Sequence, residues 1–196
     1  IEMRGPDGGA AEARWKVGGL HNLENALAAV AAAASAGVSL EQAVDAMSRC
    51  EGVKRRLERT ATVADIAIYD DFAHHPTAIA KSIKSMRRRY PGHRVIVAIE
   101  PRSNTMKLGV HNDLLADSLK DADLVWMFRP DGMRDDFEAS LQSLGSKLRL
   151  FDDYDRLVND MSTRVLGGDQ VIFMSNGGFG SARQTLTALL QRTRSG

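Results

Sequence analysis

Residues 94–99 read RVIVAI, residues 124–128 read LVWMF and residues 170–174 read QVIFM. Each stretch is an almost unbroken apolar run, which is typical of strands that helices cover on both faces. Amphipathic segments separate the runs, so strand and helix alternate along this part of the chain. The pattern predicts an α/β fold built on an open, mostly parallel sheet.

The segments around these runs complete the pattern. We expect further strands at 57–63, 66–69 and 148–151, and helices at 76–90, 111–120, 135–144, 153–165 and 181–192. The short gap at Ala64 and Asp65 predicts a tight hairpin, which makes the first strand an antiparallel edge. Pro76 suits a first helical position, where its missing N–H would have no partner anyway. The predicted fold is a doubly wound, Rossmann-like sheet.

The start of the chain has a helical character of its own. Residues 22–36 have high helix propensity and stop at Gly37. Ser39 and Gln42 match a capping box for a second helix that ends near Cys50. The first helix is predicted to be well buried through its apolar stripe of Leu23, Ala26, Leu27 and Val30.

The polar stretch EGVKRRLER at 51–59 separates the two patterns. We therefore expect a helical remnant of one domain over residues 1–55, ending in a hinge, and a complete sheet domain over residues 56–196. Within the first part, residues 13–17 are predicted to form an edge strand. The chain begins at Ile1, and we expect it to be a piece of something longer.

Composition narrows the function classes. With 43% hydrophobic and 26% charged residues over 196 positions, the chain has the composition of a globular protein and not that of a disordered or fibrous one. Lys and Arg number 26 against 25 Asp and Glu, so no global field favours nucleic acid or a membrane surface. Cys50 has no internal partner for a disulfide. A cytoplasmic protein with a small or localised ligand is the expectation.

Ligands of doubly wound sheets bind outside the carboxyl ends of the strands. The loops predicted at that edge are DDFAHHP at 70–76, EPRSNTMKLG at 100–109, RPDG at 129–132 and SNGGFGS at 175–181. Two carboxylates and two imidazoles in the first loop could cap a helix or serve a ligand. A dedicated metal site is disfavoured, because adjacent histidines point in different directions and no distant cluster completes a ligand set. The glycines of the last loop suit either a structural turn or close approach to a ligand.

Three motifs in a fixed order resemble the Mur ligases, which form amide bonds in bacterial peptidoglycan at the expense of ATP. GGLHNLENALAAVAAA at 18–33 is similar to the end of the family's central ATPase domain, GVKRRLE at 52–58 to its interdomain arginine segment, and DDFAHHPTAI at 70–79 to its strand-end signature. The resemblance implies a Mur ligase C-terminal domain here. The loop at 100–109 resembles the branch that recycles murein tripeptide more than the branch that adds L-alanine.

The resemblance implies a mechanism and its partners. UDP-N-acetylmuramate would be activated as an acyl phosphate by ATP, with Mg²⁺ neutralising the phosphates, and attacked by the amine of the tripeptide L-Ala-γ-D-Glu-meso-diaminopimelate. Such chemistry relies on positioning and charge neutralisation. Nucleic acid and membranes are not expected partners. The N-terminal and central domains of the same parent chain are.

The resemblance also implies residue roles. The adenine would contact His21, Asn22 and Asn25, the phosphates Arg56, and the ribose Asp71, while His74 and His75 would lie near the reacting groups. For the peptide we expect Arg102 to hold a carboxylate and Glu100 an ammonium, on grounds of charge complementarity. The other residues expected at the peptide end are Ser103, Asn104, Lys107, Asn176, Gly177 and Gly178.

No G-x-x-G-K-[ST] phosphate loop occurs in the 196 residues. We therefore expect this chain alone to be inactive. Two alternatives stay open on the sequence: a ligase of the same family that adds L-alanine, and a stand-alone Rossmann-like module that binds a nucleotide or a partner. The second leaves unexplained why the three motifs occur together in family order.

Overall fold

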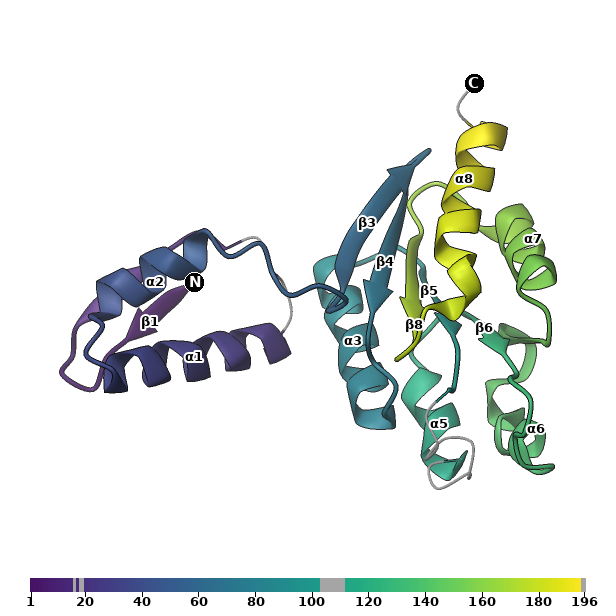
Figure 1. The fold of residues 1–196 in the computed structure, drawn as a ribbon, viewed down its shortest axis with the longest axis horizontal. Helices are drawn as coiled ribbons and strands as arrows, with labels where there is room; N and C mark the ends of the chain where they lie inside the picture. Colours follow the sequence, from purple (N-terminus) through teal and green to yellow (C-terminus); the bar gives the residue numbers. More distant parts are fainter. Residues whose placement is uncertain (16, 18–19, 103–111, 195–196) are drawn as a thin grey trace. The chain divides into compact units, whose positions relative to one another are not determined.

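The computed structural model describes residues 1–15, 17, 20–102 and 112–194, apart from the side chains of residues 20, 21, 112 and 113. It falls into two compact units, Ile1–Val53 and Lys54–Gly196. The boundary expected near residue 55 thus falls directly after Val53. Figure 1 shows both units, and each is described by itself.

Unit 1 pairs a small hairpin with two helices. Strands β1 (Glu2–Arg4) and β2 (Ala10–Glu12) are antiparallel, and helices α1 (Leu20–Ser35) and α2 (Leu40–Ser48) follow. The predicted capping box is confirmed, because Ser39 Oγ accepts from the N–H of Gln42 while the Gln42 side chain accepts from the N–H of Ser39. The edge strand predicted at 13–17 is wrong. The pairing lies earlier because residues 5–9 close a turn, in which Gly8 takes a φ of 84°.

Helix α1 is less buried than its stripe predicted. Ala26 and Val30 pack with Met3, Ala43 and Val44, but Leu23 is 39% exposed and Leu27 is 60% exposed. Among the described residues of unit 1, this core is covered by α2, the hairpin and the segment with Ala13 and Trp15, and Leu23 and Leu27 are not part of it. The expectation of a well-buried helix is therefore wrong for these two leucines.

Unit 2 is a six-stranded sheet in the order β3-β4-β8-β5-β6-β7. Its strands are β3 (Glu58–Val63), β4 (Ile66–Asp71), β5 (Val95–Ile99), β6 (Leu124–Phe128), β7 (Leu148–Phe151) and β8 (Gln170–Met174). All neighbours are parallel except β3 and β4, so the predicted antiparallel edge is confirmed. Ala64 and Asp65 both take positive φ, 47° and 62°, as a two-residue hairpin turn requires.

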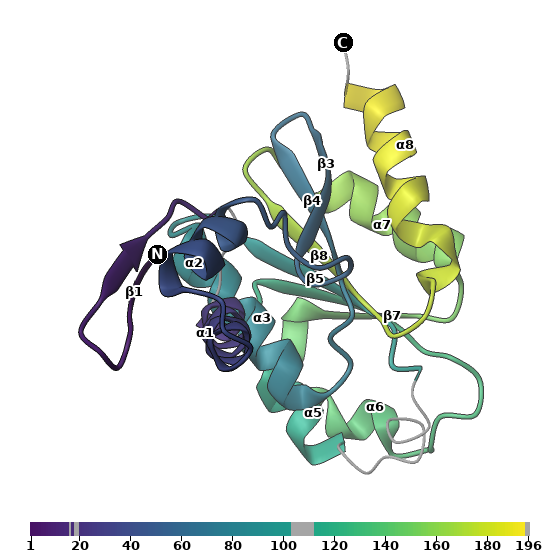
Figure 2. The ribbon, with the colours of Figure 1, turned by 60° about the vertical axis from the view of Figure 1, so that its left-hand side comes forward.

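Helices cover both faces of this sheet, as Figure 2 shows. Helices α3 (Pro76–Arg89), α5 (Asn112–Leu119) and α6 (Phe137–Ser140) share one core, and α7 (Tyr154–Arg164) and α8 (Ala182–Arg194) share the other. Strands β5 and β8 are buried throughout, which explains their apolar runs. The helix expected at 135–144 is shorter than predicted, since α6 ends at Ser140 and a 3-10 segment follows at Gln142–Lys147, interrupted by the non-helical backbone of Gly145.

Alternation along β4 prepares the site. Ala67 and Tyr69 face the α3 side, while Ile66 and Ile68 face the α8 side. The two aspartates at the strand's end continue this period of two. Because β4, β8 and β5 are neighbours and parallel, the loops after them lie together at the end of the sheet where these strands finish.

Candidate functional site

Asp70 and Asp71 leave β4 in opposite directions. The Asp71 carboxylate is 2% exposed and accepts from the N–H of Ala73 at 3.2 Å and from Ser82 Oγ at 2.5 Å, which anchors the start of α3. Asp70 lies on the α8 side, 3.6 Å from Arg55 Nε and 3.5 Å from Arg183 Nη2. Sequence reasoning chose Asp71 for a ligand, whereas Asp70 is the more accessible of the two.

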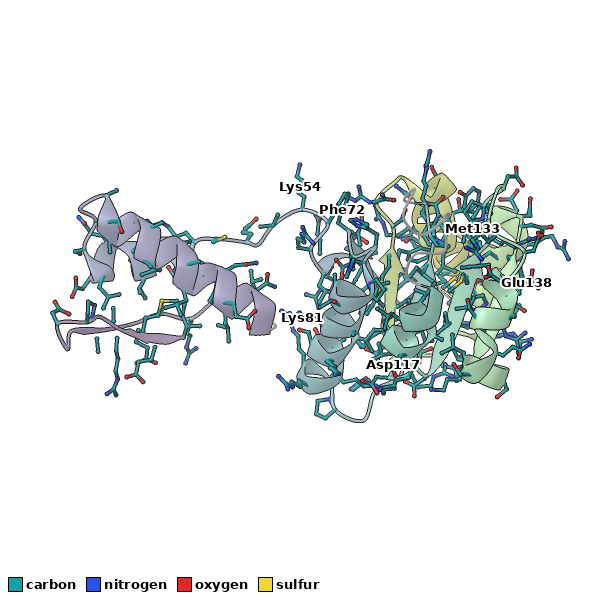
Figure 3. The ribbon with its side chains drawn as sticks, turned by 90° about the horizontal axis from the view of Figure 1, so that it is seen from below. Lys54, Phe72, Lys81, Asp117, Met133 and Glu138 are labelled. Atoms are coloured by element: carbon teal, nitrogen blue, oxygen red, sulfur yellow. The ribbon has the colours of Figure 1, made fainter. Side chains whose placement is uncertain are left out.

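Arg55 joins three segments that are distant in sequence. Its Nη2 donates to the carbonyl oxygens of Ser175 and Gly177, each at 2.6 Å, and its own carbonyl accepts from the N–H of Phe72 at 2.7 Å. Its φ of 59° is a left-handed value that a non-glycine residue keeps only when its surroundings hold it. Arg55 lies in the same GVKRRLE motif as Arg56, but the resemblance implied a role for Arg56 alone. Figure 3 shows Phe72 close to Lys54, where unit 2 begins.

Arg56 differs from Arg55 in having an exposed side chain. Its guanidinium lies 5.7 Å from the centre of the Phe72 ring, and among the described residues it has no hydrogen-bond or ion-pair partner. All of its N–H donors are therefore free to meet an oxyanion, which fits the phosphates of a nucleotide.

The two histidines carry their protons on different nitrogens. His74 Nδ1 lies 2.9 Å from the carbonyl oxygen of Phe72, and because a carbonyl only accepts, this nitrogen carries the proton. In this tautomer His74 presents an unprotonated Nε2. His75 Nδ1 accepts from the N–H of Thr77 at 3.3 Å as the N-cap of α3, so its proton sits on Nε2. The first ring offers an acceptor, and the second caps the helix.

Glu100 is a buried carboxylate that accepts hydrogen bonds from a side chain of α7 and from one that directly follows β8. It is 2% exposed, and its two oxygens accept from Tyr154 Oη at 2.5 Å and from Ser175 Oγ at 2.6 Å. Burial raises the pKa of the Tyr154 phenol well above its usual value, and the hydrogen bond to Glu100 raises it further. Tyr154 was missed because nothing in its local sequence marks it; its ring stacks on Phe128 with centroids 3.9 Å apart.

Arg102 approaches Gly177 closely. A Cβ on Gly177 would lie 2.8 Å from Arg102 Nη1, so the missing side chain leaves room for the guanidinium. Next to them, Asn176 Oδ1 is buried without a hydrogen-bond partner among the described residues. Gly178 is exposed. The predicted residues Ser103, Asn104 and Lys107 lie outside the described residues.

The residues expected around adenine belong to unit 1. Asn22 is 7% exposed, Asn25 is exposed, and the side chain of His21 lies outside the described residues. The burial of Asn22 leaves Asn25 as the more accessible amide of the pair. The part of the chain that the structure describes holds no group of three or more His, Cys, Asp or Glu side chains suited to a metal ion. In the same residues, no helix is long and apolar enough to cross a bilayer.

The family model for the Mur ligase glutamate ligase domain matches residues 55–177, from the arginine that enters the sheet domain to the glycine beside Arg102. The chain belongs to the Mur ligases. The match includes the antiparallel edge, the aspartate and histidine turn and the buried Glu100 loop.

Other Mur ligases resemble the chain beyond that domain. A UDP-N-acetylmuramate--L-alanyl-gamma-D-glutamyl-meso-2,6-diaminoheptandioate ligase of Haemophilus influenzae is 40% identical over 90% of this chain and 39% of its own length. The crystal structure of a murein peptide ligase from Psychrobacter arcticus has a TM-score of 0.71 at 37% identity, over 92% of this chain and 39% of that one. A MurF ligase of Thermotoga maritima, solved with ADP, shares the fold at 19% identity and a TM-score of 0.72, over 97% of this chain and 43% of that one. The chain thus spans about two fifths of these relatives' length.

Proposed function

We propose that the protein containing this chain is an ATP-dependent ligase that joins the tripeptide L-Ala-γ-D-Glu-meso-diaminopimelate to UDP-N-acetylmuramate in the cytoplasm, in peptidoglycan recycling. The observation that carries the proposal is the 40% identity to a ligase of that name over 90% of the chain. The contact between Arg102 and Gly177 supports it, since it brings the two loops expected for the peptide together.

ATP would supply the phosphoryl group that turns the sugar carboxylate into an acyl phosphate, and Mg²⁺ would screen the phosphates. The residues of this chain fit such a nucleotide unevenly. Arg56 has a free, exposed guanidinium for phosphate oxygens. Asn25 offers an exposed amide for the base, Asn22 of the same motif is buried, and we assign the same role to His21. In the ribose role, the buried carboxylate of Asp71 would accept from a hydroxyl in addition to its bonds from Ser82 and the N–H of Ala73.

The histidine pair suits the amine side of the reaction. An attacking amine must lose a proton, and Nε2 of His74 can take it in the tautomer in which Nδ1 donates to the carbonyl of Phe72. His75 caps α3 and holds the turn beside His74. We assign the proton transfer to His74 and a positioning role to His75.

Arg102 is the proposed partner of a peptide carboxylate, because its exposed guanidinium offers a bidentate fork. The orphan acceptor Asn176 Oδ1 lies in the neighbouring loop and suits a ligand N–H. Gly177 and Gly178 give this loop its open surface, and Ser103, Asn104 and Lys107 would complete the peptide end. Each oxygen of Glu100 already accepts one hydrogen bond, so a peptide ammonium would share this buried carboxylate with Tyr154 and Ser175.

The test is ADP release by the chain extended with the upstream portion that its relatives possess. UDP-N-acetylmuramate, ATP and Mg²⁺ are supplied with either tripeptide or L-alanine. Turnover with tripeptide supports the proposal, turnover with L-alanine alone moves the protein to the alanine-adding branch, and turnover with neither supports a binding module.

The same assay tests Arg102. We expect Arg102→Ala to raise the tripeptide KM by roughly tenfold or more, because a charge-assisted fork is lost. Arg88→Ala is the matched control, since Arg88 is an exposed arginine near the C-terminal end of α3, far along that helix from the site. Equal tripeptide kinetics in both variants would contradict the role of Arg102.

A further inference from the structure

A hollow of about 280 Å³ opens on the α8 side of the sheet edge. Its lining includes Gly177, the residue that Arg102 approaches, but neither Arg102 itself nor the two histidines. Its charged walls are Arg55, Asp70 and Arg183, and the rest comes from Phe173, Ser175, Gly177, Gly178, Phe179 and Gln184. Two guanidinium groups face one carboxylate, so the hollow carries a net positive charge.

Arg183 is the cation in this hollow with donors to spare. Arg55 spends its Nη2 group on two carbonyl oxygens. Arg183 has only the ion pair with Asp70, at 3.5 Å, and no hydrogen bond joins its guanidinium to any described residue. Asp70 divides its charge between both arginines, since Arg55 Nε lies 3.6 Å from the same Oδ2 atom. A side chain that is 21% exposed is open to a ligand from solvent.

The backbone adds to the positive potential. Arg183 is the second residue of α8 (Ala182–Arg194), and the first N–H groups of a helix of this length carry partial positive charge. Gly177 and Gly178 also line the hollow, and the N–H of Gly177 already donates to Ser175 Oγ at 2.9 Å. The guanidinium fork and the helix start both favour a small, negatively charged group of two or three oxygens.

We propose that this hollow is a subsite for a compact oxyanion, a carboxylate or a phosphoryl group, and that Arg183 binds it through its guanidinium fork. The identity of the source rests on the proposed function, which offers the carboxylates of the tripeptide and the phosphates of the nucleotide. Asp70 opposes this binding by holding Arg183 and by adding negative charge.

The test measures ligand binding to the 196-residue chain. Chemical shifts of the Gly177 and Gly178 amides and of Arg183 Nε are monitored by ¹H–¹⁵N NMR. Inorganic phosphate, ADP and the tripeptide are titrated separately. We expect Arg183→Gln to weaken binding of at least one probe by roughly tenfold, and Arg183→Lys to weaken it less, because a lysine keeps the charge without the fork. Asp70→Asn should tighten the same probe, since it removes the competing carboxylate.

Arg192→Gln is the matched control, because Arg192 lies on the same helix with an exposed side chain and no ion pair among the described residues. Loss confined to the tripeptide assigns a carboxylate, and loss confined to phosphate and ADP assigns a phosphoryl group. The proposal is overturned if the wild-type chain binds none of the probes, or if Arg183→Gln and Arg192→Gln behave alike. The ligase assay tests the subsite separately from the proposed function. If Arg183→Gln leaves turnover unchanged, the subsite has no role in the reaction, and the proposed function is not affected.

Discussion

Tyr154 Oη donates a hydrogen bond of 2.5 Å to Glu100 Oε1 across 54 positions of sequence. Tyr154 is the first residue of α7 and Glu100 directly follows β5. The second carboxylate oxygen binds Ser175, directly after β8. A single buried side chain therefore fixes the positions of two loops at the site relative to a helix on the α8 side.

Tyr154→Phe removes the donor and leaves a buried carboxylate oxygen unpaired. We expect a loss of about 1.5 to 3 kcal/mol in the free energy of unfolding, as is usual for a hydrogen bond to a charged group. Urea denaturation measures it. A loss below about 0.5 kcal/mol would mean that water replaces the phenol at Glu100.

The same phenol predicts a loss of stability in alkali. Burial and the bond to Glu100 raise the Tyr154 pKa above the ordinary 10.0, and burial with the bond to Tyr90 raises that of Tyr69. A raised phenol pKa contributes stability that is complete below pH 10 and is lost as the pH climbs toward the folded-state value. Urea midpoints should therefore fall between about pH 9 and about pH 11, and less steeply in Tyr154→Phe. Parallel slopes would contradict this.

Gly180 has no room for a side chain. Its φ is 52°, and a Cβ would lie 2.4 Å from Cδ2 and Cε2 of Tyr154. Gly132 is the control, with a φ of 79° and no atom within 4 Å of such a Cβ. Both alanine variants pay about 1 to 2 kcal/mol for a left-handed backbone. Gly180→Ala should lose about 1 to 3 kcal/mol more, by overpacking, in thermal or urea unfolding.

Gly177 and Gly178 form a second matched pair. A Cβ on Gly177 meets the mobile end of Arg102, whereas a Cβ on Gly178 meets nothing within 4 Å. Both alanine variants should keep their stability to within about 1 kcal/mol. In the extended protein, Gly177→Ala should weaken tripeptide binding on the order of tenfold by displacing Arg102, and Gly178→Ala should not. The reverse order would place the peptide elsewhere.

Asp169 lies directly before β8, at the end of the sheet away from the candidate site. Arg94 donates to it twice, from Nε at 2.8 Å and from Nη2 at 2.6 Å, and the N–H of Leu166 adds a third bond at 2.7 Å. Asp169→Asn should cost about 1.5 to 3 kcal/mol of unfolding free energy, because the bonds to a charged group weaken while the shape is kept. Asp65→Asn, at an exposed hairpin position, should change it little.

Asp71 and Ser82 separate a structural role from a ligand role. Both Ser82→Ala and Asp71→Asn break one buried hydrogen bond, and each should cost about 1 to 3 kcal/mol of stability. If Asp71 contacts the ribose, Asp71→Asn also raises the KM for ATP while Ser82→Ala leaves it unchanged. Equal ATP kinetics would make the carboxylate an anchor of α3 alone.

The sheet could be predicted because its signal is local and repeated. Runs such as 94–99 and 170–174 need only their own residues to indicate burial on two faces. The hairpin of β1 and β2 was missed because three-residue strands carry almost no periodicity. The burial of Leu23 and Leu27 depends on which other elements pack against α1, and the apolar pattern of the helix does not contain that information.

The sequence predicted which loops form the candidate site better than it predicted which residues in them contact one another. The motif led to Asp71 and Arg56, whereas Asp70 forms the ion pairs with Arg55 and Arg183, and Arg55 makes the hydrogen bonds to the Ser175–Gly177 loop. Which of two adjacent residues turns inward depends on strand register and on a left-handed φ, and neither is visible in composition. Tyr154 and Arg183 come from helices on the α8 side, and only the assembled sheet brings them to this edge.

Arg55 stands two residues past the boundary between the units and is tied to carbonyls 120 and 122 positions further on. The side chain of Arg55 thus couples the first residues of unit 2 to the backbone of the Ser175–Gly177 loop. A displacement of the chain at Arg55 would therefore displace that loop as well.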